Sequence, residues 1–339
     1  MESASNAGVA VAQARSRVTN PLQDFSELVA CVLPHLDNGR IHSCELVRWY
    51  KRRREKLVVE IKATAPDGNG HAPTRCIVKM HGSDRTIGSY EALSRLWEAG
   101  FRPPSPYTVP RPVAYIADRG LLVQEKAPGA PLLDIILRGG HDATDAVVRA
   151  VGWLAALHTS SVEAAPRRAK LLSAVTRYAK ELAAILPLQA SRITRLAASA
   201  LEEIESSDQS VSVPSHGDFH PKNIFITPTG QVTAIDFDTF GRQAAAADVA
   251  YFLAQTAIMG YFRRGSFAAT AFVRDSFLEA YEKAVFPLPR RRLALYLGMA
   301  FLQSLHYELW VLRNDKPAII EPWLDNGERC LLGGEAMLS

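Results

Sequence analysis

One short segment in the second half of the chain constrains its fold more than any other. It reads His-Gly-Asp-Phe-His-Pro-Lys-Asn over residues 216–223, and Ile-Asp-Phe-Asp follows over residues 235–238. Asn223 lies five residues after Asp218, and Asp236 lies thirteen residues after Asn223. The segment predicts a strand, a loop, a second strand and a turn, which hold two aspartates and an asparagine at fixed separations.

This combination of side chains suits phosphoryl transfer from ATP. One carboxylate, Asp218, would orient the attacking hydroxyl and accept its proton as the catalytic base. An amide oxygen from Asn223 and a second carboxylate from Asp236 would hold Mg²⁺ against the phosphates, with Asp238 as a further candidate ligand. The motif therefore predicts ATP and Mg²⁺ as cofactors and a hydroxyl as the acceptor.

The same residues resemble the aminoglycoside phosphotransferase/choline kinase family, whose members commonly read H-G-D-x-H-x-x-N and then I-D-x-x. The resemblance is specific over residues 215–248 and extends in outline from Arg40 to Tyr281. It implies a protein-kinase-like fold with the nucleotide bound between two lobes, and a small-molecule hydroxyl as substrate. It also implies that His216 braces the catalytic loop and that Asp248 caps a helix or bonds that loop.

Other interpretations of these residues are open from the sequence. A metal-dependent hydrolase could use the two histidines and the aspartate of residues 216–220, since imidazole and carboxylate suit zinc or iron. That leaves Asn223 and Asp236 without a role. The aspartate and asparagine could also be turn residues only, or the fold could be a kinase-like protein that binds its ligand without catalysis. A protein kinase is disfavoured because no Ala-Pro-Glu motif follows residues 235–238.

The remainder of the chain predicts a β-rich part followed by a helical part. Strands are expected at residues 43–50, 57–63, 75–80, 113–117 and 121–127, with one helix at residues 88–99. Helices are then expected at residues 131–137, 143–157, 168–186, 190–204, 248–261, 267–284 and 290–312. This order is the α+β, bilobal plan of protein-kinase-like enzymes. The expected division is a flexible leader at 1–22, a nucleotide-binding lobe at 23–127 and a catalytic and substrate-binding lobe at 128–339.

A kinase-like plan also requires groups that hold the nucleotide in the β-rich lobe. Lys79 lies in an otherwise apolar strand and needs an anionic partner, for which Glu91 in the next helix is the candidate. No glycine-rich loop stands between the first two strands, and a basic run stands there instead, so either a cation such as Arg53, or its neighbour Arg52 or Arg54, lies over the triphosphate, or the hairpin is solvated and contacts no ligand. Glu125 and Ala127 mark the predicted hinge, where main-chain atoms would bind adenine.

Composition argues against several classes of protein. The formal net charge is +4, and the basic run at residues 51–56 accounts for it, so the chain lacks the strong basic stripe of a nucleic-acid binder. Four scattered cysteines without C-x-x-C spacing favour reduced thiols in a cytoplasmic protein. The N-terminal region lacks the apolar stretch of a secretory signal. Two long apolar stretches, residues 244–262 and 293–312, contain charged or polar residues and are expected to be buried helices rather than membrane spans.

The acceptor is the least constrained part of the prediction. In the family that the motif resembles, the acceptor lies among helices of the second lobe, and antibiotic kinases often line that pocket with carboxylates. Candidate carboxylates and aromatic residues in the helical tail are Glu279, Glu282, Glu308, Asp315, Glu321, Asp325, Trp310 and Trp323. An acidic, aromatic pocket would suit an amino sugar, an aminoglycoside or a choline-like amine, and a neutral sugar stays open as well.

Overall fold

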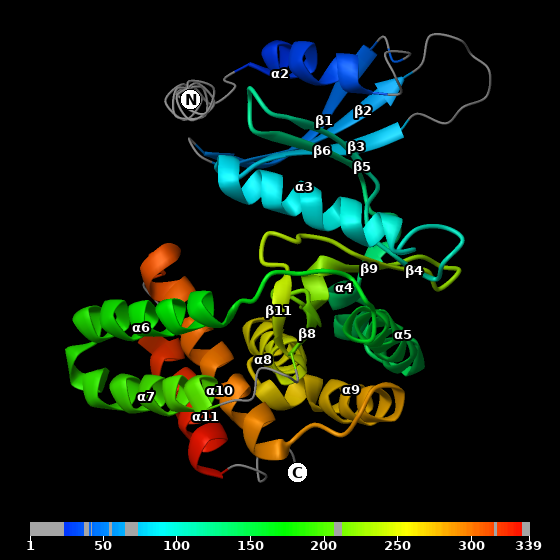
Figure 1. Cartoon of the computed structure of the whole chain (residues 1–339). Helices are drawn as coiled ribbons and strands as arrows, with labels where there is room; N and C mark the ends of the chain where they lie inside the picture. Colours follow the sequence, from blue (N-terminus) through cyan, green and yellow to red (C-terminus); the bar gives the residue numbers. More distant parts are fainter. Residues whose placement is uncertain are drawn as a thin grey trace, which may run out of the picture. The chain divides into compact units, whose positions relative to one another are not determined.

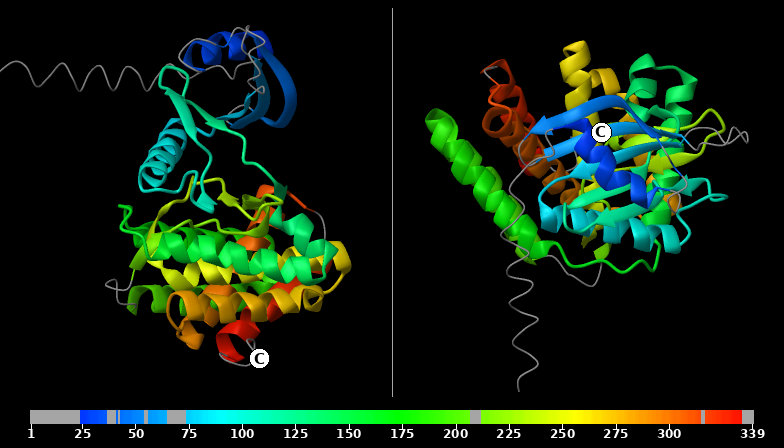
Figure 2. Two further views of the ribbon diagram at one scale, coloured as in Figure 1. Left: turned by 90° about the vertical axis from the view of Figure 1, so that its right-hand side faces the viewer. Right: turned by 90° about the horizontal axis from the view of Figure 1, so that it is seen from above.

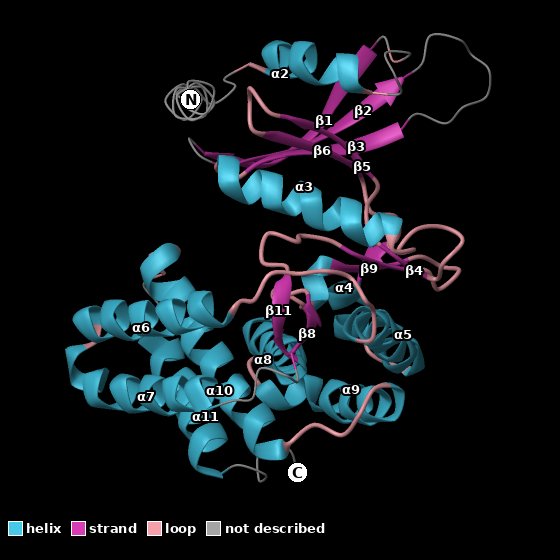
Figure 3. Ribbon diagram, viewed as in Figure 1, coloured by secondary structure: helices cyan, strands magenta, loops and turns pink. Residues whose placement is uncertain are grey.

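The chain forms two compact units, Met1–Ala127 and Pro128–Ser339. The structure is a computed structural model, and it describes residues 24–36, 41, 43–53, 56–64, 74–206, 212–314 and 317–333. The N-terminal unit is built on a β-sheet and the C-terminal unit is mostly helical, as Figures 1 and 3 show. The predicted α+β fold class is therefore confirmed. The predicted leader, residues 1–22, lies outside the described residues.

An antiparallel sheet of five strands forms the N-terminal unit, in the order β1-β2-β3-β6-β5. Its strands are β1 (Ser43–Arg53), β2 (Lys56–Thr64), β3 (Thr74–Met80), β5 (Pro112–Ile116) and β6 (Leu121–Glu125), and a short β4 (Tyr107–Thr108) precedes β5. Arg53 pairs with Lys56, so the predicted hairpin at the basic run is confirmed. The first two strands are longer than expected because the basic residues continue the ladder.

The two faces of this sheet are covered by different helices, as Figures 1 and 2 show. Alternate residues such as Val59 and Val78 point to one face and are fully buried there with Leu28 of α2 (Phe25–Val32). A 3-10 turn at Leu33–His35 follows that helix. The other helix, α3 (Ser83–Glu98), contacts β3, β5 and β6. The sequence predicted α3 but not α2.

Helices make up most of the C-terminal unit (Figure 3). They are α4 (Leu132–Arg138), α5 (His141–His158), α6 (Arg168–Ile185), α7 (Ala190–Ser206), α8 (Ala245–Arg264), α9 (Ala271–Ala284), α10 (Arg290–His306) and α11 (Ile320–Gly333). Short helical turns lie at Pro187–Gln189, Phe267–Thr270, Tyr307–Val311 and Pro317–Ile319. All of the predicted helices form, and α11 was not predicted.

The apolar helices α8 and α10 lie in the core of this unit. Most side chains of both helices are buried, and α10 contacts α7, α8 and α11. Helices that are apolar on all sides are expected in the middle of a packed unit. No described helix combines the length and apolarity that a membrane span requires. The interpretation as buried core helices is confirmed for residues 245–262 and for 293–306, whereas residues 307–312 form a π-helical turn and its end, with no buried residue.

Short antiparallel ribbons position the two motif segments. β8 (Ser212–Ser215) pairs with β11 (Gly241–Ala244), and β9 (Ile224–Ile226) pairs with both β10 (Val232–Ala234) and β7 (Ala130–Pro131). The first motif loop connects β8 to β9 and ends in a 3-10 turn, Pro221–Asn223. The second connects β10 to β11. Because the strands that flank the first loop pair with the strands that flank the second, the two motif loops lie next to each other.

Candidate active site

Asn223 and Asp218 are joined by direct hydrogen bonds. The amide nitrogen Nδ2 of Asn223 donates to the backbone oxygen of Asp218 at 3.0 Å and to its carboxylate Oδ2 at 3.1 Å. Asn223 is buried, with 7% of its surface exposed. Since the amide nitrogen faces Asp218, the amide oxygen Oδ1 points the other way. Oδ1 is the atom that a cation would use.

The second loop is tied to Asn223 and holds an unusual backbone conformation. The Ile235 amide donates to the Asn223 carbonyl at 2.8 Å, which places the next residue, Asp236, beside Asn223. Asp236 has a φ of 72°, a left-handed conformation that few residues other than glycine adopt. Such strained residues often lie at functional sites, where the surrounding structure holds them. Asp238 lies two residues further along the same loop and is partly exposed.

Asp248 holds the first motif loop by hydrogen bonds to its backbone. This carboxylate is fully buried and accepts from the backbone amides of His216 and Gly217, each at 2.8 Å. It is also 3.2 Å from Gln243 Nε2 and from His158 Nε2. Burial alone would raise the pKa of Asp248, but the hydrogen bond and charge of His158 and the loop amides lower it on balance. Asp248 therefore stays ionised and can hold two amides of the loop at once.

Both ring nitrogens of His216 are engaged within the loops. Nε2 lies 3.0 Å from the Ile235 carbonyl, and Nδ1 accepts from the Asp218 amide at 3.3 Å. The ring is fully buried and burial lowers its pKa, so His216 is neutral, with its proton on Nε2. Among the described residues there is no group of three or more His, Cys, Asp and Glu that could hold a metal ion. The hydrogen bonds of both His216 ring nitrogens within the loops leave that ring no free lone pair for the metal of a hydrolase.

His220 of the motif and Tyr251, which the sequence did not single out, hold the Asp218 carboxylate. Tyr251 on α8 donates a hydrogen bond to it, and His220 Nε2 lies 3.7 Å from its Oδ2. Burial would raise the pKa of Asp218, but His220, His216 and Tyr251 lower it on balance. Burial raises the pKa of Tyr251 well above its usual value, so the hydroxyl keeps its proton and stays a donor. Asp218 is thus a carboxylate at neutral pH. Tyr251 lies three residues after Asp248 on the same helix, which is the sequence signal that could have found it.

The residues predicted to hold the nucleotide lie in the N-terminal unit. Lys79 is buried on β3, with 7% of its surface exposed, and its ladder neighbours are Val58 and Leu122. The carboxylate of Glu91 pairs instead with Arg95, at 3.1 Å, and half of the Glu91 side chain is exposed. The predicted ion pair with Lys79 is therefore replaced by a local one. The reason is the i, i+4 spacing, which brings Arg95 within reach on the outer side of α3.

The predicted hinge is held by ion pairs at the end of β6. Glu125 Oε1 lies 2.7 Å from Arg111 Nη2, and the next residue, Lys126, bonds the buried carboxylate of Glu60 at 2.8 Å. Ala127 is buried and is the last residue of the N-terminal unit. Arg53 ends β1, and its side chain lies outside the described part of the structure. The hinge is therefore fixed by these side chains and by its own backbone, because the amides of Glu125 and Lys126 donate to the carbonyls of Arg111 and Arg75, each at 2.9 Å.

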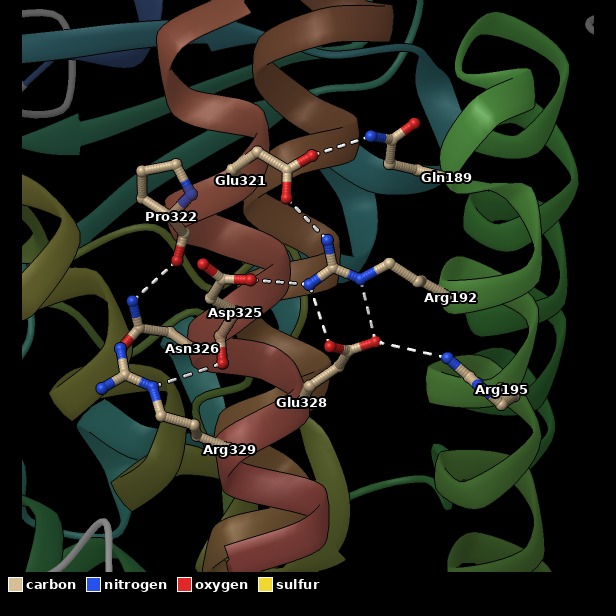
Figure 4. A network of polar contacts seen from close by, with 9 residues as sticks. All are labelled: Gln189, Arg192, Arg195, Glu321, Pro322, Asp325, Asn326, Glu328 and Arg329. Carbon is tan, nitrogen blue, oxygen red and sulfur yellow. Dashed lines mark hydrogen bonds and ion pairs between the residues drawn. The ribbon is translucent and has the colours of Figure 1, made fainter.

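The acidic residues of the helical tail do not gather into one pocket. Figure 4 shows Arg192 of α7 bound to Glu321, Asp325 and Glu328 of α11, at 2.6, 2.7 and 2.9 Å. Other carboxylates bind within their own region: Glu282 to Arg290 at 2.9 Å and Glu308 to Asn314 at 2.8 Å, while Glu279 is exposed on α9.

The two tryptophans predicted for the acceptor pocket are in different environments. Trp323 is buried, with 1% of its surface exposed, whereas Trp310 stacks on His306. Asp315 lies outside the described residues. The expectation of an acidic, aromatic pocket built from the tail is corrected. Carboxylates of the helical tail already form ion pairs between helices, and the sequence does not show which arginine each of them will bind.

Comparison with known proteins agrees with this geometry. Residues 82–295 match the phosphotransferase enzyme family, APH. No curated protein matches the sequence.

Solved structures with a similar fold are small-molecule kinases. Choline kinase LicA from Streptococcus pneumoniae has a TM-score of 0.58 at 14% identity, over 91% of this chain and 98% of that chain. An aminoglycoside phosphotransferase from Alicyclobacillus acidocaldarius has a TM-score of 0.51 at 16% identity, over 86% and 91%. The amicoumacin kinase hAmiN, in complex with AMP-PNP, Ca²⁺ and Ami, has a TM-score of 0.59 at 13% identity, over 95% of each chain. These likenesses show the kinase-like fold. Because the family match spans more than half of the sequence, the chain belongs to the APH phosphotransferase enzyme family.

Proposed function

We propose that this protein is an ATP- and Mg²⁺-dependent phosphotransferase that moves the γ-phosphoryl group of ATP to a hydroxyl of a small molecule. The observation that carries the proposal is the pair of hydrogen bonds from Asn223 to Asp218, at 3.0 and 3.1 Å. They set a carboxylate base beside an amide whose oxygen faces away from it, as phosphoryl transfer requires. The similarity to a kinase that binds AMP-PNP and Ca²⁺ supports the same chemistry.

The donor set at the two loops fits Mg²⁺. Asn223 would contribute its amide oxygen and Asp236 its carboxylate, with Asp238 as a further ligand, directly or through water. Few protein ligands are expected, because Mg²⁺ usually keeps waters and takes the remaining oxygens from phosphates. When bound, the ion neutralises charge on the phosphate oxygens. The strained φ of Asp236, 72°, is explained if it aims this carboxylate at the ion.

Asp218 would act as the catalytic base. Its lowered pKa keeps the carboxylate ionised, and the hydroxyl of Tyr251 fixes its orientation. In that position it orients the acceptor hydroxyl towards the γ-phosphoryl group and takes the hydroxyl proton as the new oxygen–phosphorus bond forms and the bond from the γ-phosphorus to the β–γ bridging oxygen breaks, which releases ADP. Asp248 and His216 take no part in the chemistry. They hold the loop so that Asp218 and Asn223 stay together.

Other residues are proposed to bind the nucleotide. Buried Lys79 is the cation for its phosphates, and the main chain from Glu125 to Ala127 binds adenine. We retain Arg53 of the basic hairpin as a candidate over the triphosphate. Glu91 is retained as a nucleotide-site residue even though Arg95 is its partner in the structure.

The acceptor class stays broad: a sugar, an amino sugar or aminoglycoside, or a choline-like amine. A screen that measures ADP formation from ATP and Mg²⁺ over these classes tests the function. Turnover should appear with at least one class and should be lost in Asp218→Asn. The matched control is Asp145→Asn, because Asp145 is an exposed aspartate on α5 whose ion pair, within the described part of the chain, is with His141. ATP binding without turnover on any class would favour the catalytically inactive binding protein instead.

A further inference from the structure

A partly buried arginine, Arg167, lies beside the Asp218 loop and has no role in the function proposed so far. Arg167 directly precedes α6, and its backbone is fixed along β11: its amide donates to the Arg242 carbonyl at 2.9 Å, and the Arg242 amide donates to the Ala165 carbonyl at 2.8 Å. From there the side chain passes over Gly241. A Cβ atom at Gly241 would come within 2.5 Å of Arg167 Cγ, so the arginine needs a glycine there.

The guanidinium ends against a second glycine, Gly217, between His216 and Asp218. Gly217 has a φ of 80°, which already favours glycine. A Cβ atom at this position would collide with Arg167 Nη1 and with the Thr239 carbonyl oxygen. Arg167 therefore occupies the space that a side chain in the catalytic loop would need. Thr239 follows Asp236 in the second loop, so the guanidinium lies where the two functional loops meet.

A direct contact confirms that the loops meet at this point. The hydroxyl of Thr239 donates to the His216 carbonyl at 3.3 Å. The guanidinium is thus placed between the segment that carries the base and the segment that carries the second carboxylate. Displacing it would loosen both segments at once.

Packing alone does not explain an arginine at this place. Its Nη1 atom is buried and has no hydrogen-bond partner among the described residues, which lowers stability. Burial lowers the pKa of Arg167, while the charges of Asp248 and Asp218 oppose that shift. A partly buried cation with a buried, unpaired Nη1 atom, within the electrostatic reach of the base and of the carboxylate that braces its loop, points to a role in the reaction.

We propose that Arg167 is a positioning residue for phosphoryl transfer, whose guanidinium lies between the Asp218 loop and the Asp236 loop and keeps the base in register with the metal-ligating groups. The inference rests on the proposed function. Without the side chain, the space beside Gly217 would be empty and Asp218 would sample other positions. A displacement of about 1 Å in a reacting group is enough to slow a reaction roughly 100-fold.

The test compares Arg167→Gln and Arg167→Lys with the wild type, using the acceptor that gives turnover in the screen above. We expect kcat of Arg167→Gln to fall roughly 10- to 100-fold, and KM for ATP to change by less than about threefold. Arg167→Lys should keep more activity than Arg167→Gln, because it retains the charge. Thermal unfolding of each variant is measured alongside.

Arg149→Gln is the matched control. Arg149 lies on α5, and its guanidinium packs against Gly230 in the β9–β10 hairpin, which has a φ of 85°. A Cβ atom on Gly230 would collide with Arg149 Nη1, as one on Gly217 would with Arg167 Nη1. We expect its kcat to equal that of the wild type. If kcat of Arg167→Gln equals that of the wild type, this inference is overturned and the proposed function is not affected. Equal losses of kcat in Arg167→Gln and Arg149→Gln would have the same consequence. A wild type without turnover would overturn the proposed function, and this inference with it.

Discussion

Replacing Asp248 by asparagine should destabilise the C-terminal unit strongly, although the two side chains have the same shape. The carboxylate accepts from two loop amides, from Gln243 and from His158. Asparagine keeps one acceptor oxygen and turns an N–H group towards the second loop amide. One charge-assisted bond is lost, about 1.5–3 kcal/mol, and a buried N–H is left without a partner, about 1–3 kcal/mol. Together they predict a loss of about 2.5–6 kcal/mol, a large part of the ~5–15 kcal/mol that holds a typical domain folded.

Urea unfolding, followed by tryptophan fluorescence, measures this loss. Trp153 is a suitable reporter because its ring stacks on Phe219 of the Asp218 loop, with centroids 5.8 Å apart. The difference between the variant and the wild type should also depend on pH. The pKa of Asp248 is lowered in the folded state, so its stabilisation is present above the unfolded value of about 4 and is lost as pH falls through the folded pKa. A loss below about 0.5 kcal/mol at pH 7 would refute the account of this loop, since that is the scale of ordinary surface substitutions.

Three further predictions concern single side chains. Asp236→Asn should fold normally, because asparagine tolerates the φ of 72°. The variant should need a roughly tenfold higher Mg²⁺ concentration for half-maximal rate. An unchanged Mg²⁺ requirement would exclude Asp236 as a metal ligand. Burial lowers the pKa of His216, so as pH falls below about 6.5 the unfolded chain binds a proton on this ring before the folded protein does. The free energy of unfolding of the wild type should therefore fall below about pH 6.5, by up to about 1.4 kcal/mol per pH unit. His216→Phe should show a smaller decrease. Tyr251→Phe removes a hydrogen bond to Asp218 worth about 1 kcal/mol and should lower kcat about fivefold, which steady-state kinetics against the wild type will measure.

The sequence was most informative where chemistry and spacing coincide. Asp218, Asn223 and Asp236 are separated by fixed numbers of residues, and a short ribbon on each side leaves few ways to arrange them. Strands and helices with clear periodicity were also predicted, because the burial of one face determines their pattern. The helix α2, Phe25–Val32, was missed because it has only eight residues, about two turns of amphipathic helix, and no motif lies near it.

Partner choice between distant side chains could not be predicted from the sequence. The sequence analysis paired Glu91 with Lys79, whereas in the structure Glu91 pairs with Arg95, one turn further along α3. The carboxylates of α11 meet Arg192 only because α7 packs against that helix. Arg167 could not be found either, since its place depends on the absence of a Cβ at Gly217, and no sequence pattern links the two residues.

The central claim is that Asp218 is the base in a phosphoryl transfer from ATP, and one paired measurement tests it most directly. The turnover of Asp218→Ala is compared with the wild type on an active acceptor, and ATP binding to both proteins is measured by calorimetry. The account predicts a fall in kcat of roughly 10²–10⁴-fold with ATP affinity nearly unchanged. Turnover of Asp218→Ala near the wild-type rate would contradict it.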